Sequence, residues 1–141
     1  IEKLINFEKK IKINNENPYK KFVNRIQNLK KKTNILLLNL KRQNKNIHIY
    51  GASTKGNTIL QWYGIDNNLI KFAADRNKDK WNARTISSNI QIISEKKSKK
   101  LNPDYYFVLP WHFKKEFLER EKKFLHSRGK MIFPLPKLKI Y

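Results

Sequence analysis

The first 45 residues carry apolar positions at the spacing of a helix and not of a strand. Between residues 19 and 43 the apolar side chains fall on one face, with Lys and Arg on the other, which predicts an amphipathic helix. Residues 14–18 read Asn-Asn-Glu-Asn-Pro and predict a break, and the mixed apolar and basic stretch before them suits a helical linker. We therefore expect residues 1–45 to form a helical lead-in packed on the domain that follows.

From residue 46 onward, short apolar runs alternate with helical segments. The runs that predict strands cover residues 46–50, 69–74, 90–93, 105–109 and 130–133. The segments that predict helices begin near residue 57 and cover residues 94–101 and 113 to about 125. Strands that alternate with helices form parallel sheets with right-handed crossovers. We therefore predict an α/β fold for residues 46–141: a Rossmann-like, doubly wound, mainly parallel five-stranded sheet, preceded by one or two helices.

The segment that joins the first predicted strand to its helix is the strongest candidate for ligand contact. It reads Gly-Ala-Ser-Thr-Lys-Gly-Asn-Thr over residues 51–58 and is called the Gly51 segment below. Its glycines allow unusual backbone angles, and its hydroxyl and amide side chains can cap a helix. A helix N-terminus attracts anions, and Lys55 adds a full positive charge. The candidate binding residues are Gly51, Ser53, Thr54, Lys55, Gly56, Asn57 and Thr58.

The Gly51 segment matches neither standard phosphate-binding loop. Ser53 stands where a GxGxxG loop has its second glycine, and Lys55 precedes Gly56, the wrong order for a Walker A loop. A tight strand-to-helix turn that binds nothing is therefore an open alternative.

Three further candidates follow the ends of predicted strands and should share the carboxyl edge of the sheet with the Gly51 segment. Asp75, 24 residues after Gly51, could bind ribose hydroxyls or could cap its own turn. Trp111 could stack on a ring or seal the core. We expect His112 to contact the ligand rather than to act as a catalytic base, because no partner acid lies near it in the sequence.

The net charge of +21, from 32 Lys and Arg against 11 Asp and Glu, is a reason to consider nucleic acid. The lysines are spread through every segment, however, and are not gathered beside aromatic residues that could stack on bases. Positive charge alone supplies only non-specific affinity. We therefore do not expect specific nucleic-acid binding, and expect the charge to favour anionic ligands or acidic partner surfaces.

The remaining composition argues against several kinds of site. There is no cysteine, and the three histidines are scattered, so we predict no metal site. The chain has no apolar run long enough for a transmembrane helix and no signal-peptide pattern, and we expect a cytoplasmic protein without membrane contact. Because it begins at Ile1 without a Met, we also expect a fragment of a longer protein.

Several stretches, in the right order, make the chain from residue 50 to its end resemble the C-terminal domain of the sugar C-methyltransferase family. They are Tyr-Gly-Ala-Ser-Thr-Lys-Gly-Asn-Thr at 50–58, Gly-Ile-Asp at 64–66, Ala-Asp-Arg-Asn at 74–77 with Lys80, Lys-Leu-Asn-Pro-Asp-Tyr at 100–105, Leu-Pro-Trp at 109–111 and Phe-Pro-Leu-Pro at 133–136. The predicted helix of residues 19–43 also matches the lead-in of that domain. The chain departs from the family at residues 81–88, which lack a glycine and a Pro-Gly-Thr element, and at His112, where the family often has Asn.

The resemblance implies a role in methyl transfer to a nucleotide-linked deoxysugar. In the family, S-adenosylmethionine is bound mainly by an upstream methyltransferase domain of the same chain, and zinc by an N-terminal region. Neither is present in these 141 residues, so no cofactor is expected in the fragment itself. The resemblance also implies that the nucleotide-linked sugar lies between this domain and the upstream domain, which carries the catalytic base, so we assign no catalytic residue to this chain.

Our hypothesis is therefore the C-terminal substrate-cleft domain of an S-adenosylmethionine-dependent C-methyltransferase, inactive alone. The alternatives are a stand-alone Rossmann-like module that binds a nucleotide or coenzyme and, third, a basic nucleic-acid-binding domain.

Overall fold

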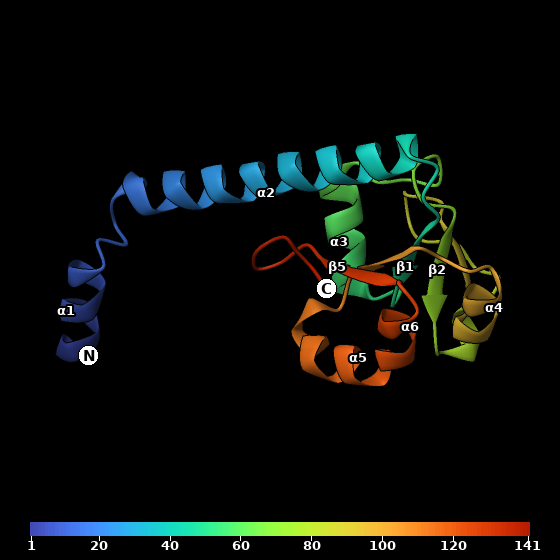
Figure 1. Cartoon of the computed structure of the whole chain (residues 1–141). Coiled ribbons are helices and arrows are strands. Elements are labelled where there is room, and N and C mark those ends of the chain that lie inside the picture. The colour runs from blue at the N-terminus through green and yellow to red at the C-terminus, as the bar shows by residue number, and fades with distance from the viewer.

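The computed structural model describes all 141 residues, and it is a mixed α/β structure built on one sheet (Figure 1). The strands are β1 (Ile47–Tyr50), β2 (Phe72–Asp75), β3 (Gln91–Ser94), β4 (Tyr105–Val108), β5 (Lys130–Phe133) and β6 (Lys139–Ile140). The helices are α1 (Glu2–Lys10), α2 (Glu16–Arg42), α3 (Thr54–Tyr63), α4 (Glu95–Lys100), α5 (Lys114–Arg120) and α6 (Lys122–His126). Two 3₁₀ turns, η1 (Lys78–Lys80) and η2 (Trp111–Phe113), complete the chain.

The strand order is β3-β2-β1-β4-β5-β6, with every pair parallel except β5 and β6. The chain reverses its direction of travel across the sheet between β1 and β4, which are direct neighbours. The predicted Rossmann-like α/β fold is confirmed, with six strands and not five. The sixth strand, β6, was missed because it has two residues, both exposed, and therefore no buried face to give a pattern.

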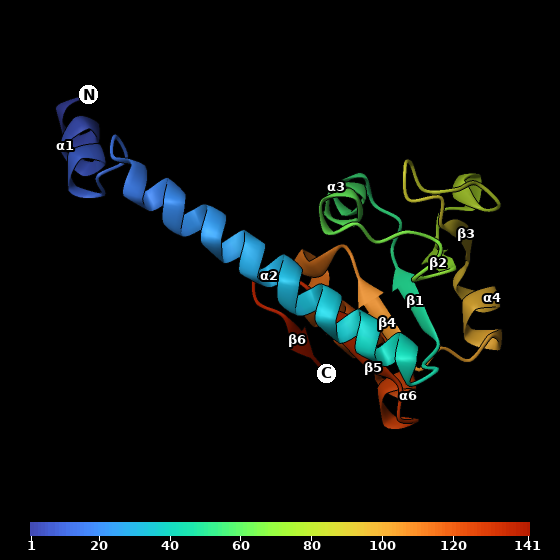
Figure 2. The same ribbon diagram turned by 90° about the horizontal axis from the view of Figure 1, so that it is seen from above.

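Alternate residues of the strands build two apolar layers. Ile49 and Phe107 point to one face, where Leu37 and Leu40 of α2 and Leu60 of α3 cover them. Tyr50, Tyr106 and Phe133 point to the other face, which Phe117 of α5 and Phe124 and Leu125 of α6 cover. Seen from above, α2 crosses the sheet on one side (Figure 2). The sheet is thus the middle of three layers.

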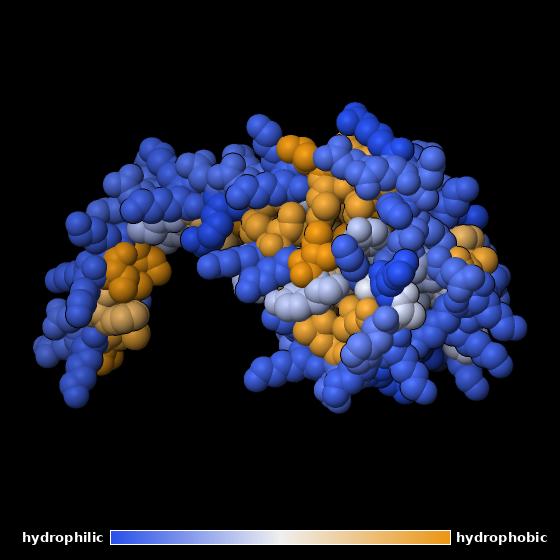
Figure 3. Space-filling view, viewed as in Figure 1, coloured by the Kyte–Doolittle hydropathy of each residue, from blue (hydrophilic) through white to orange (hydrophobic).

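Helix α2 packs on the sheet only with its C-terminal part. Its buried residues are Thr33, Leu37 and Leu40, and α1 has none. The first half of α2 and α1 stand out from the body as an arm (Figure 1), and apolar side chains gather on the side of α1 that faces the body (Figure 3). The break between the two helices lies at residues 11–15, not 14–18, because Pro18 sits in the first turn of α2, where no intrahelical N–H bond is needed.

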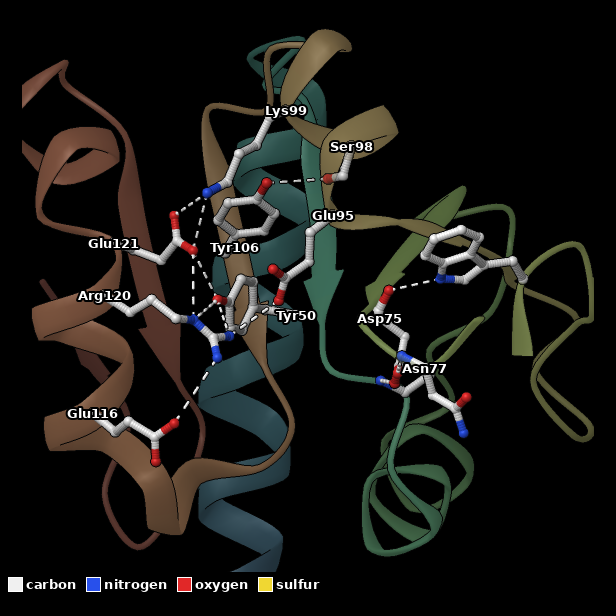
Figure 4. A network of polar contacts seen from close by, with 12 residues as sticks. Tyr50, Asp75, Asn77, Glu95, Ser98, Lys99, Tyr106, Glu116, Arg120 and Glu121 are labelled. Atoms are coloured by element: carbon white, nitrogen blue, oxygen red, sulfur yellow. Dashed lines mark hydrogen bonds and ion pairs between the residues drawn. The ribbon is translucent and has the colours of Figure 1, made fainter. Parts of the chain in front are cut away.

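The predicted helix over residues 113–125 is interrupted at Glu121, between α5 and α6. The side chain of Glu121 is only 2% exposed and accepts a hydrogen bond from the Tyr50 hydroxyl at 2.8 Å (Figure 4). Lys99 of α4 pairs with the same carboxylate at 2.8 Å. Arg120 donates to the Tyr50 hydroxyl from Nε at 3.0 Å and pairs with Glu95 at 3.0 Å. This network ties α4 and the α5–α6 segment to the centre of the sheet.

A second polar chain crosses the same face, from His48 Nδ1 to the Ser98 hydroxyl at 2.8 Å and on to the Tyr106 hydroxyl at 3.1 Å. All three side chains are buried. Burial raises the pKa of Tyr106 to about 12 and lowers the pKa of His48 to about 4, because the charged form of each loses its hydration. His48 is therefore neutral in the folded protein at pH 7.

The depressed pKa of His48 should make the fold sensitive to mild acid. Between pH 6.5 and about 4 the unfolded chain binds a proton at His48 that the folded chain does not, so stability is complete above pH 6.5 and falls as the pH is lowered. The loss reaches roughly 3 kcal/mol at the lower end. Urea unfolding of the parent and of His48→Gln across this range should show a flatter profile in the variant, whereas exposed His112→Gln should follow the parent. Identical profiles for all three proteins would contradict this assignment.

Candidate functional site

A shallow crevice lies at the carboxyl edge of the sheet, between the connection that leaves β1 and the one that leaves β4. Its volume is about 450 Å³. The lining residues are Ser53, Thr54, Lys55, Pro110, His112, Phe113, Glu116 and Phe117. In open α/β sheets ligands bind outside the carboxyl ends of the strands where the strand order reverses, and β1 and β4 flank that point here. The crevice is therefore the candidate site.

The turn after β1 requires glycine at two positions, for different reasons. Gly51 has φ +82°, and a Cβ there would also lie 2.6 Å from Pro110 Cγ. Gly56 does not use the backbone freedom of glycine, since it sits in the first turns of α3 without a positive φ. A Cβ on Gly56 would instead lie 2.6 Å from Leu109 Cδ1. Both glycines thus let the β1 and β4 connections touch.

Helix α3 begins at Thr54 and not near Asn57, because Ser53 acts as its N-cap. The Ser53 hydroxyl accepts the Gly56 amide at 3.0 Å. The amides of Thr54 and Lys55 donate to no acceptor within the protein and lie at the crevice. With the exposed Lys55 side chain they offer an anion two free N–H groups, the positive end of α3 and a mobile cation.

The last two residues of the Gly51 segment lie outside the crevice lining. Thr58 is exposed on α3. Asn57 is half-buried, and its Oδ1 is buried without a hydrogen-bond partner. The structure therefore brings Ser53, Thr54 and Lys55 to the crevice and leaves these two on the body of the helix.

Asp75 holds the Gly51 segment against the end of β2 (Figure 4). Its Oδ2 accepts the Ala52 amide at 2.8 Å and lies 3.6 Å from Lys80 Nζ, and its Oδ1 accepts the Asn77 amide at 2.8 Å. Lys80 in turn donates to the Ala52 carbonyl at 3.0 Å. Both carboxylate oxygens thus have partners within the protein. This geometry matches the alternative in which Asp75 caps its own turn. A ribose hydroxyl bound by Asp75 would have to share the carboxylate oxygens with these protein partners.

The residues after β4 divide between core and crevice. Trp111 is half-buried and packs against the apolar clusters of both sheet faces, and it is not among the crevice-lining residues. His112 is exposed and lines the crevice beside Phe113. Glu116 of α5 also lines it and was not predicted, because an exposed Glu in a basic amphipathic helix reads as an ordinary solvated position. The one sequence signal for Glu116 is its short spacing from the end of β4, about one helical turn beyond η2, which places it near the carboxyl edge of the sheet.

A larger hollow, of about 680 Å³, opens at the opposite edge of the sheet. It is lined by Lys99, Lys123, Arg128 and other residues that precede β4 and β5. Lys99 and Arg120 there are already paired with carboxylates. Because the strands begin at this edge and the connections at the switch point do not reach it, we assign the candidate site to the smaller crevice.

No three or more His, Asp or Glu side chains gather closely enough to hold a metal ion. None of the helices combines the length and the apolar character that crossing a bilayer demands.

Replacing Asp75 should free the Gly51 segment from β2. Asp75→Ala leaves the Ala52 amide without its acceptor and is expected to lower the free energy of unfolding by about 1–3 kcal/mol. Hydrogen exchange of the Ala52 amide should accelerate at the same time. Asp79→Ala, at an exposed residue without an ion pair, is the matched control and should change neither quantity. An unchanged exchange rate at Ala52 in Asp75→Ala would contradict the role of this carboxylate.

Comparison with known proteins gives two results. Residues 1–136 match the family model described as the C-methyltransferase C-terminal domain. The chain is also 29% identical over 122 residues to the C-methyltransferase NovU of Streptomyces niveus, a match that covers 86% of this chain and 29% of that protein. The chain therefore spans less than a third of the length of this relative. The resemblance noted in the sequence is confirmed: this chain belongs to the family of C-methyltransferase C-terminal domains.

Proposed function

We propose that this chain is the substrate-cleft domain of a cytoplasmic C-methyltransferase that acts on a nucleotide-linked keto-deoxysugar. In the proposed reaction a base removes a proton from the carbon next to the sugar keto group, and the resulting carbanion forms the new carbon–carbon bond. S-adenosylmethionine, bound mainly by an upstream domain, would supply the methyl group. This chain would hold the substrate and would be inactive alone.

The crevice between the β1 and β4 connections is the observation that carries the proposal. It stands at the switch point of the sheet in a chain that belongs to a C-methyltransferase family. Its polar groups include the free amides of Thr54 and Lys55, the ammonium of Lys55, the His112 ring and the Glu116 carboxylate. Amides and an ammonium are groups that bind oxyanions.

The crevice supports binding better than catalysis. Its only titratable groups are Lys55, His112 and Glu116, all three exposed, and no two of them are hydrogen-bonded or ion-paired. A general base is usually oriented by a hydrogen bond to a second group. We therefore assign proton abstraction to the upstream domain, and to Lys55 the stabilisation of negative charge on the phosphate or enolate.

The proposal that this chain binds the substrate but does not transfer the methyl group can be tested on the chain itself, with a thymidine diphosphate-linked keto-deoxyhexose as the probe. Calorimetric titration should show binding, and an assay with labelled S-adenosylmethionine should show no transfer of methyl to the sugar. Lys55→Ala should weaken binding about tenfold, ~1.4 kcal/mol, because one charge contact to the ligand is lost. Lys100→Ala, an exposed and unpaired lysine at the far end of α4, should bind as the parent does.

Two outcomes would count against the proposal. Methyl transfer by the 141 residues alone would show that the catalytic groups are in this chain. Equal affinity of the parent and Lys55→Ala would remove Lys55 from the binding site.

A further inference from the structure

A second opening at the carboxyl edge lies between α2 and the loop that follows β5. Its volume is about 470 Å³. The lining residues are Lys21, Asn24, Arg25, Asn28, Leu29 and Lys32 of α2, with Pro136 and Lys137 of the loop. We call this opening the α2 groove. Because the loop leaves the carboxyl end of β5, the groove shares its edge of the sheet with the crevice.

The α2 groove contains four cations and no carboxylate. None of the four, Lys21, Arg25, Lys32 and Lys137, takes part in an ion pair. In the larger hollow at the opposite edge of the sheet, two of the four cations, Lys99 and Arg120, are paired with carboxylates, and the lining itself includes Asp104 and Glu121. Like charges gathered around one opening repel one another, and a bound anion removes that repulsion.

These cations of α2 do not lie simply on the solvent-exposed face of the helix, opposite the sheet. Residues 21, 25, 28 and 32 recur every three or four positions and so form one stripe. The neighbouring stripe, Thr33, Leu37 and Leu40, is the one buried on the sheet. The cationic stripe therefore flanks the packed stripe, and the opposite wall, at Pro136 and Lys137, brings a fourth cation toward it.

We propose that the α2 groove binds the diphosphate of a nucleotide-linked ligand. This rests on the proposed function, which puts a nucleotide-linked sugar at this edge. Arg25 can bind phosphate oxygens through two N–H groups, and the three lysines add point charges. The amides of Asn24 and Asn28 supply neutral donors and acceptors along the same wall.

Single-stranded nucleic acid fits these features less well. Non-specific single-strand sites stack bases on open aromatic faces. The groove lining contains no aromatic residue, and one face of the neighbouring Phe22 ring already has a cation–π partner, the Arg25 guanidinium at 5.4 Å from the ring centroid.

The test is calorimetric titration of the chain with inorganic pyrophosphate at about 150 mM salt, where exposed charges are screened. The groove variant is Lys21→Gln, Arg25→Gln and Lys32→Gln together. The control is Lys10→Gln, Lys31→Gln and Lys100→Gln, three exposed lysines outside the groove that take part in no ion pair. Both triple variants lose three positive charges from the net +21, so they differ only in where the charge is removed. Circular dichroism checks that both remain folded.

The proposal expects saturable binding of pyrophosphate with one site, weakened at least tenfold in the groove variant and less than twofold in the control. Equal weakening in both variants, or no saturable binding by the parent, would overturn it. Tighter binding of a single-stranded oligonucleotide that is lost in the groove variant alone would assign the groove to nucleic acid and would also overturn it. The Lys55→Ala result concerns the crevice, so the two proposals can fail separately.

Discussion

The contact between the β1 and β4 connections is the constraint on which the site depends. A side chain on Gly51 would meet Pro110, and one on Gly56 would meet Leu109, each at 2.6 Å. Such distances leave no room for even a methyl group without a shift of the neighbour. The two glycines therefore fix how closely the start of α3 approaches the chain after β4, and this approach makes the two walls of the crevice.

The groups around this contact divide into those that hold it and those that it exposes. Asp75 binds the Ala52 amide, and Lys80 binds the Ala52 carbonyl, so the turn is fixed from the side of β2. On the sheet face that α5 and α6 cover, the hydroxyl of Tyr50, the last residue of β1, donates a hydrogen bond to the buried Glu121. With its backbone held from both directions, the turn leaves the Thr54 and Lys55 amides free. Rigid support of free donors is the arrangement that binds an anion with little reorganisation.

Local pattern predicted the fold well because each β/α unit carries its own signal. The five parallel strands follow from apolar runs and turn residues, whereas capping chemistry left several candidate caps for α3, of which Ser53 is the one used. The role of Glu121 could not be found this way, since residues 113–125 read as one helix and Tyr50, the partner of the Glu121 carboxylate, is 71 residues away in the sequence. The pattern left Asp75 ambiguous for a similar reason, because its role depends on where the Ala52 amide lies. What the sequence left open was thus set by partners distant along the chain.

The central claim is that the crevice between the β1 and β4 connections is the ligand-facing part of this chain. The most direct measurement is an NMR titration of the ¹⁵N-labelled chain with a thymidine diphosphate-linked keto-deoxyhexose. The account predicts amide shifts on Ser53, Thr54 and Lys55, with further shifts at His112 and Glu116, beside those that the diphosphate would cause in the α2 groove. Shifts centred instead on Lys123 and Arg128, at the opposite edge of the sheet, would contradict it.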